Sequence, residues 1–246
     1  MIDTHCHLDC IDNVEEIVKN FDGIIITSGC DDISNKKVID LVNKYKNVFG
    51  TLGIHPEEAD KKYNLDFIVE NINNPKIVGI GEIGLDYHYV SDNIEKQKEL
   101  FRKQLDIADE YNLPVVVHSR DAINDTYNIL SEYKLTGSIH CFSSSLEMAI
   151  KFINLGYKIG VGGVVTFKNG KKLKDVVSGI DINDILTETD SPYLSPEPYR
   201  GKVNNPSNVF YVMKEIAHIK EMSFEDVKKI TVDNSKKVFE RLNLYI

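Results

Sequence analysis

The chain opens with the stretch Met1-Ile2-Asp3-Thr4-His5-Cys6-His7-Leu8-Asp9, which has the composition of a strand ending in polar side chains. Side chains two positions apart on a strand lie on the same face, with Cα atoms about 7 Å apart. The imidazoles of His5 and His7 can therefore converge on one metal ion, for which neutral imidazole is the commonest ligand. Two histidines also fall at this spacing by chance, so the interpretation depends on the rest of the chain.

The same arrangement, a short apolar run that ends in a polar residue, recurs along the whole chain. The strands that we expect are Met1–His7, Gly23–Ser28, Val48–His55, Ile77–Leu85, Pro114–Ser119, Gly137–Phe142, Tyr157–Val161 and Ile185–Asp190. The helices that we expect are Asp32–Lys46, Glu57–Asn73, Asn93–Asn112 with Asp92 as its cap, Ala122–Tyr133, Ser145–Leu155, and two more around Pro206–His218 and Ser223–Leu242.

Eight strands alternating with helices predict an α/β fold, a (β/α)₈ TIM barrel that forms a single domain over residues 1–246. A doubly wound open sheet is the alternative, but it would not need eight strands, and no GxGxxG turn follows the first strand. In a barrel, functional side chains belong at the carboxyl ends of the strands, where the loops form the active-site face.

Composition limits the partners that this chain can have. The formal charge of −9 excludes binding to long duplex DNA through the overall field, so any phosphate must be met by local cations. The lysines at 168, 171, 172 and 174 could supply such cations or simply begin a solvated helix. We expect no membrane span and no signal peptide. The four cysteines lack a framework spacing, which favours reduced thiols and a cytoplasmic location. Cys6 and Cys141 are expected to pack as small apolar residues.

Ligand-type residues gather where the predicted strands end. They are His5 and His7 on the first strand, His55 on the third, Glu82 on the fourth, His118 on the fifth, His140 on the sixth and Asp190 on the eighth. Four histidines and two carboxylates exceed the needs of one tetrahedral ion and suit two ions about 3.5–4 Å apart. We assign His5, His7 and Asp190 to the first ion, His118 and His140 to the second, and Glu82 as the bridge.

Several of these segments resemble those of the TatD family of metal-dependent deoxyribonucleases, which belongs to the amidohydrolase-like barrel superfamily. The matching segments are 3–9, 53–56, 81–87, 114–122, 140–143 and 188–194, in order and at ordinary spacing. The resemblance implies a TIM barrel, Mg-dependent activity and the metal ligands His5, His7, Glu82, His118, His140 and Asp190. The later segment 195–202 departs from the family pattern at Tyr199, and Asn205 departs from it as well. Both changes bear on substrate preference.

The remaining candidates have roles in catalysis or in substrate binding. Asp190 either deprotonates the attacking water or serves only as a ligand, and His55 either contacts substrate, donates a proton or packs before Pro56. Arg120 and Arg200 are candidate phosphate clamps, with an ion pair to Asp86 or Asp121 as the rival role of Arg120. Tyr193 is a candidate for stacking on a base or sugar.

The leading hypothesis is therefore a deoxyribonuclease that cleaves DNA phosphodiester bonds, in single strands or at ends, with two divalent ions such as Mg, Mn or Zn. The first alternative keeps the metal centre but hydrolyses an amide, lactone or ester, including an aminoacyl-tRNA ester. The second is a non-catalytic metal-binding protein. No obligate protein partner is evident.

Overall fold

The structure is a computed structural model that describes residues 1–88 and 92–245, and within them the strands form one eight-stranded sheet. The strands are β1 (Ile2–Cys6), β2 (Ile24–Ser28), β3 (Val48–Leu52), β4 (Ile77–Asp86), β5 (Val115–Arg120), β6 (Gly137–Ile139), β7 (Tyr157–Val161) and β8 (Ile185–Thr187). Neighbours from β1–β2 to β7–β8 pair in parallel, and the strand order follows the chain. The eight expected strands are thus confirmed, although four of the predicted site residues lie just beyond the strands to which they were assigned: His7, His55, His140 and Asp190.

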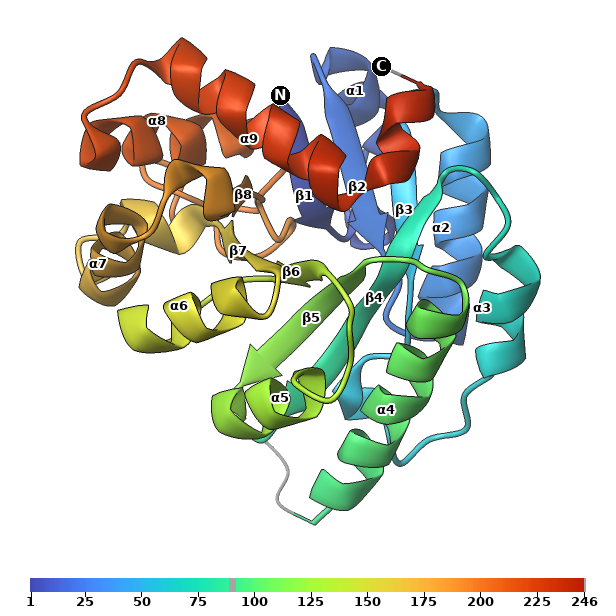
Figure 1. Ribbon diagram of the computed structural model, residues 1–246. Helices are drawn as coiled ribbons and strands as arrows, with labels where there is room; N and C mark the ends of the chain where they lie inside the picture. The colour runs from blue at the N-terminus through green and yellow to red at the C-terminus, as the bar shows by residue number, and fades with distance from the viewer. Residues whose placement is uncertain (89–91, 246) are drawn as a thin grey trace.

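The helices surround the sheet, as Figure 1 shows. They are α1 (Val14–Asn20), α2 (Asp32–Lys44), α3 (Leu65–Asn71), α4 (Ile94–Glu110), α5 (Ile123–Leu130), α6 (Leu146–Asn154), α7 (Lys171–Gly179), α8 (Val209–Lys220) and α9 (Phe224–Val238). Short 3₁₀ turns add η1 (Leu8–Cys10), η2 (Pro56–Glu58), η3 (Gly163–Thr166), η4 (Ile182–Asp184), η5 (Pro206–Asn208) and η6 (Glu240–Leu244). No helix among the described residues is long and apolar enough to cross a membrane.

Three helix predictions need correction. The expected helix over Glu57–Asn73 is two separate elements, η2 and α3, because Asn64 interrupts it by accepting the backbone N–H of Asp66 at 3.1 Å and starting a new helix. The N-cap of α4 is Asn93, whose side chain bonds Asp60, and Asp92 does not cap it. The last helix ends at Val238, and η6 follows it. The lysine-rich segment does begin a helix, α7.

The barrel closes where β8 meets β1. The hydroxyl of Thr4 donates to the carbonyl of Thr187 at 3.1 Å. Beyond the strand ends, the N–H of Asp190 donates to the carbonyl of His5 at 3.0 Å, and the N–H of His7 donates to the carbonyl of Ser191 at 2.7 Å. These bonds bring the first and last candidate ligands of the chain side by side.

The two ends of the barrel differ in character. An apolar cluster joins inward residues of the strands to the C-terminal segment, and its members are Ile2, Ile24, Ile26, Phe49, Val78, Val116, Leu186, Val238, Phe239 and Leu242. In Figure 1, α9 and the segment after it lie on the same side of the molecule as the N-terminus, where the strands begin. The larger core packs the outer face of the strands against the helices. The carboxyl ends of the strands are therefore free to build a polar site.

Candidate metal centre

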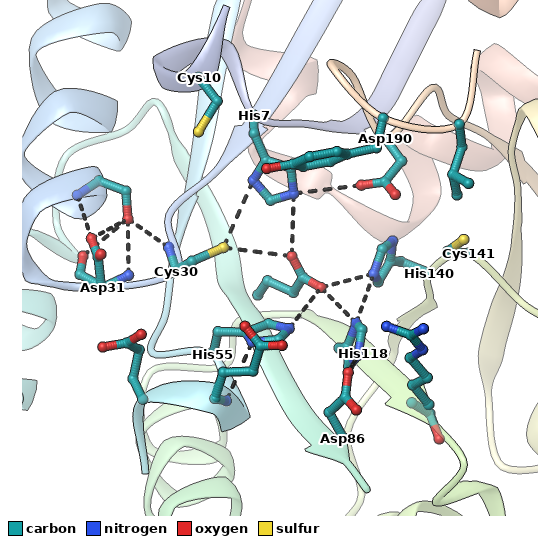
Figure 2. A pocket seen from close by; sticks show the side chains of 18 of the residues that line it. His7, Cys10, Cys30, Asp31, His55, Asp86, His118, His140, Cys141 and Asp190 are labelled. Atoms are coloured by element: carbon teal, nitrogen blue, oxygen red, sulfur yellow. Dashed lines mark hydrogen bonds and ion pairs between the residues drawn. The ribbon is translucent and has the colours of Figure 1, made fainter. Parts of the chain in front are cut away.

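A cavity of about 770 Å³ opens at the carboxyl ends of the strands. Its walls carry most of the predicted ligands, and Figure 2 shows His7, His55, His118, His140 and Asp190 pointing toward a common centre. His5 lies beneath them and is fully buried. All six predicted metal ligands are therefore brought together, from the carboxyl-terminal parts of five strands: β1, β4, β5, β6 and β8.

Glu82 stands at the middle of this arrangement, and its two carboxylate oxygens face different groups of histidines. Its Oε2 lies 3.4 Å from Nε2 of His5 and 3.4 Å from Nε2 of His7. Its Oε1 lies 2.9 Å from Nδ1 of His118 and 2.8 Å from Nε2 of His140. A carboxylate placed in this way has the geometry of a bridge between two ions.

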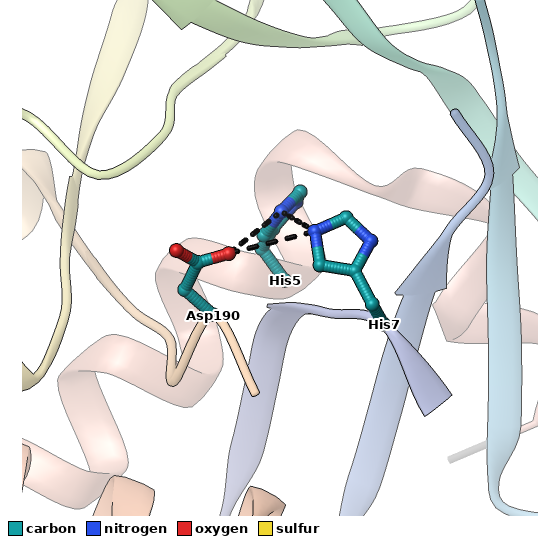
Figure 3. Close-up of side chains that lie close together, drawn as sticks. All are labelled: His5, His7 and Asp190. Atoms are coloured by element: carbon teal, nitrogen blue, oxygen red, sulfur yellow. Dashed lines mark hydrogen bonds and ion pairs between the residues drawn. The ribbon is translucent and has the colours of Figure 1, made fainter. Parts of the chain in front are cut away.

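The first group has nearly tetrahedral spacing. Bonds of about 2.0–2.2 Å place neighbouring ligands of a tetrahedral ion about 3.3–3.6 Å apart. The Nε2 atoms of His5 and His7 are 3.3 Å apart, and Oδ1 of Asp190 lies 3.6 and 3.5 Å from them, as Figure 3 shows. With Oε2 of Glu82, which lies 3.4 Å from both imidazoles, these residues supply four donors for a divalent ion.

The second group is more open. Nδ1 of His118 and Nε2 of His140 are 3.4 Å apart, and each contacts Oε1 of Glu82. Three protein donors leave at least one coordination position for water or substrate, which is typical of catalytic sites. Nδ1 of His118 faces the ion position because its Nε2 is 2.9 Å from Oδ2 of Asp86.

Residues behind the ligands hold the imidazole rings. Besides Asp86, the buried carboxylate of Glu188 places Oε1 at 3.6 Å from Nδ1 of His140. The hydroxyl of Ser28 lies 3.0 Å from Nδ1 of His5, and the carbonyl of Ser28 lies 3.3 Å from Nδ1 of His7. Hydrogen-bond partners of this kind fix which nitrogen faces the metal and raise ligand basicity, whereas Glu188, at 3.6 Å, acts on His140 through its charge.

His55 differs from the other histidines. Its Nδ1 accepts the backbone N–H of Glu57 at 3.3 Å, so in the neutral ring the proton is on Nε2, which lies 3.6 Å from Oε1 of Glu82. Burial lowers the pKa of His55 to about 3, so the ring is neutral at physiological pH. It presents a hydrogen-bond donor to the cavity.

The other carboxylates and imidazoles of the centre shift one another's pKa values. Burial favours a neutral Glu82, but the neighbouring His140 and His5 outweigh it and hold the pKa of that carboxyl well below its usual value. Burial opposes charge on His140, yet Glu82 and Glu188 raise its pKa well above the usual value. The pKa of His118 is also raised, because Asp86 and Glu82 outweigh burial. In the metal-free protein, these shifts favour the protonated forms of His118 and His140.

Of the three predicted substrate-binding residues, two line the cavity and one does not. Arg120 and Tyr193 line the cavity, and the Tyr193 ring centroid is 6.0 Å from that of His7. Arg200 is not among the described residues that line it; its guanidinium stacks on Phe167 at 4.3 Å. Its phosphate contact stays a prediction.

The expectation that both Cys6 and Cys141 pack as small apolar residues is wrong for Cys141. Cys6 is buried in the core between the strands and helices, as expected. Cys141 instead lines the cavity, because its backbone turns there with a φ of 46°. Cys30 lines the cavity as well, although no motif in the sequence predicts it there. Asp86 and Glu188 were also not selected, although both sit in the strand-end motifs that contain the ligands.

Comparisons with known proteins agree with this geometry. The family model described as TatD related DNase matches residues 2–240. The chain is 38% identical to the uncharacterized metal-dependent hydrolase YabD of Bacillus subtilis, over 99% of this chain and 100% of that protein. It is 35% identical to the uncharacterized metal-dependent hydrolase YcfH of Escherichia coli K12, over 97% of this chain and 95% of that protein.

Among solved structures, YjjV, a TatD homologue from Escherichia coli K12, superposes with a TM-score of 0.90 at 28% identity and covers 98% of both chains. A TatD family hydrolase from Entamoeba histolytica shares the fold with a TM-score of 0.82 at 23% identity, over 97% of both chains. The barrel, the ligand cluster and these relatives agree, and the chain belongs to the TatD family of metal-dependent hydrolases.

Proposed function

We propose that this hydrolase cleaves phosphodiester bonds of DNA, in single strands or at strand ends. The observation that carries the proposal is Glu82, whose two oxygens face two separate groups of imidazoles 2.8–3.4 Å away. Two adjacent divalent ions suit phosphoryl transfer, in which both the attacking and the leaving oxygen carry charge. The family model, described as TatD related DNase, supports the same activity.

The charges of the cavity walls limit how a DNA strand can enter. Arg120, Ser119 and Ser143 line the cavity beside β5 and β6, where they offer donors to phosphate oxygens. Acidic side chains line the opposite side, next to β1–β3: Asp9, Asp31, Glu57 and Glu58. A flexible strand can keep its phosphates on the Arg120 side, whereas a rigid duplex cannot avoid the acidic side.

Individual residues then have distinct roles in hydrolysis. When bound, two divalent ions lower the pKa of a coordinated water and polarise the phosphoryl group. Asp190 orients the attacking water and accepts its proton. His55 donates its Nε2–H toward the leaving oxygen, Arg120 holds the phosphate, and Tyr193 stacks on a base or sugar. Mg, Mn or Zn would each satisfy a donor set of imidazoles and carboxylates.

A second candidate function is the hydrolysis of an amide, lactone or carboxylic ester, including an aminoacyl-tRNA ester. The acidic side of the cavity favours the small amide, lactone and ester substrates of this class, because a neutral or cationic molecule is not repelled by Glu57 and Asp31. The same donor set would polarise a carbonyl as well as a phosphoryl oxygen. We also propose a cytoplasmic location, since the cysteines at 6, 10, 30 and 141 are free thiols.

A substrate panel tests both candidates. The purified protein is incubated with Mg²⁺, Mn²⁺ or Zn²⁺ and with single-stranded DNA, duplex DNA with blunt ends, a lactone and an aminoacyl ester. The proposal expects the fastest turnover with single-stranded DNA, and carbonyl hydrolysis without DNA cleavage would overturn it. The Glu82→Ala variant is the control: undiminished activity would reveal a contaminant, and no activity of the natural protein on any substrate would favour a non-catalytic role.

A further inference from the structure

The thiol of Cys30 lies at the metal centre but outside both predicted ligand groups. Its Sγ is 3.6 Å from Oε2 of Glu82 and 3.7 Å from Nδ1 of His7. One ligand atom each from His7, Cys30 and Glu82 lies within 4.8 Å of the others, a spacing compatible with a shared metal ion. Figure 2 shows the side chain of Cys30 directed toward His7.

The distances agree with coordination geometry. A tetrahedral ion with a sulfur bond of about 2.3 Å and nitrogen or oxygen bonds of about 2.1 Å places the sulfur about 3.6 Å from its neighbours. Both distances from Sγ are close to this value. Cys10 and Cys141 also line the cavity, but neither joins such a group among the described residues.

We propose that Cys30, His7 and Glu82 form a separate, sulfur-containing ion position that selects thiophilic divalent cations such as Cd²⁺, Zn²⁺ and Co²⁺. A thiolate is a soft ligand and prefers these ions to Mg²⁺ or Mn²⁺. The thiol releases its proton to solvent when the sulfur binds the ion. The position lies at the edge of the hydrolytic centre and shares two of its residues.

The shared residues make this position compete with the first ion. His5 and Asp190 surround Nε2 of His7, whereas Cys30 approaches Nδ1 of the same ring. A neutral imidazole has only one unprotonated nitrogen, so His7 serves one position at a time. With the proton on Nδ1, the ring donates to the carbonyl of Ser28 and serves the first ion; to serve the position at Cys30, the proton must move to Nε2 and the bond to Ser28 is lost. Oε2 of Glu82 is shared in the same way. A thiophilic ion at Cys30 therefore displaces a hard ion from the first position.

Titration of the metal-free protein with Cd²⁺ tests the proposal by ultraviolet absorption, because a thiolate–cadmium bond adds a charge-transfer band. We expect this band in the natural protein and in Cys10→Ser and Cys141→Ser, and its loss in Cys30→Ser. Calorimetry should show Cd²⁺ binding weakened by about tenfold or more in Cys30→Ser, with Mn²⁺ binding nearly unchanged. A band that persists in Cys30→Ser, or no band in the natural protein, overturns the proposal.

A second measurement needs no variant and so does not depend on the folding of one. Alkylation of the natural protein with iodoacetamide, mapped by mass spectrometry, reports the reactivity of each cysteine. Cd²⁺ should protect Cys30 and leave Cys10 reactive, whereas the same concentration of Mg²⁺ should protect neither. Equal alkylation of Cys30 with and without Cd²⁺ contradicts the proposal. Neither measurement uses a substrate, so the outcome is independent of the bond that the enzyme hydrolyses.

Discussion

At the scale of single residues, two carboxylates lie behind the histidines of the second ligand group. Asp86 contacts Nε2 of His118 at 2.9 Å, and Glu188 approaches Nδ1 of His140 at 3.6 Å. We expect Asp86→Asn and Glu188→Gln each to weaken metal binding by about 10–100-fold, because each removes a negative charge beside an imidazole and the new amide at position 86 can also donate a hydrogen bond to the ring and favour the wrong tautomer. Calorimetry measures the change. Glu132→Gln, on the surface, is the control, and unchanged affinity in both variants would contradict the assignment.

Asp190 has two candidate roles, as a metal ligand and as the base that accepts a proton from the attacking water. Its Oδ1 lies 3.6 and 3.5 Å from the Nε2 atoms of His5 and His7. We expect Asp190→Asn to keep metal in the centre, since an amide oxygen can still bind it, and to lower turnover by about 10²–10⁴-fold because an amide accepts no proton. Metal content and turnover on the best substrate are measured together. Turnover that stays near the natural rate with full metal content would leave Asp190 as a plain ligand.

At the scale of elements, the alternation of β-branched runs and amphipathic stretches predicted all eight strands, and the strand-end rule gathered the six ligands. Hydrophobic patterning carries this information because every strand of the barrel is buried on both faces. The break between η2 and α3 was missed, since it depends on the local bond from Asp66 to Asn64 and not on periodicity. Cys30 was missed because its importance arises from contacts with His7 and Glu82, which are distant in sequence.

The element β7 also contributes, although it carries none of the predicted ligands. A Cβ atom added at Gly160 would lie 2.5 Å from Oε2 of Glu188 and 2.9 Å from Cα of His140, whereas one at Gly162 would lie 3.7 Å from Cγ of Glu188. We expect Gly160→Ala to lower the free energy of unfolding by about 1–3 kcal/mol and to weaken metal binding, because it displaces Glu188. Gly162→Ala is the matched control and should change stability by less than about 0.5 kcal/mol. Denaturant unfolding and calorimetry measure both effects, and equal behaviour of the two variants would argue against this packing.

At the scale of the whole molecule, the metal centre joins β1 and β8 to the middle of the barrel, so metal binding and global stability are linked. An ion at about 100 times its dissociation constant adds about 2.7 kcal/mol, which for a chain of this size raises the midpoint of thermal unfolding by about 5–10 °C. Removal of metal with a chelator should lower the midpoint of thermal unfolding by the same amount. The pKa values of His118 and His140 are raised in the metal-free protein, and both rings must lose their protons to bind an ion.

Protons and metal therefore compete, and the stabilisation by metal should shrink as the pH falls. The carboxylate of Glu82 stays ionised, since its pKa is lowered, so the imidazoles set this dependence. We expect a large increase in the unfolding midpoint on adding Mn²⁺ at about pH 8 and a much smaller one at about pH 5.5, below the usual pKa of histidine. Thermal unfolding followed by circular dichroism, with and without metal at each pH, measures the difference. An increase of the same size at both pH values would mean that the ion is held mainly by carboxylates, because carboxylates alone would remain deprotonated over this range.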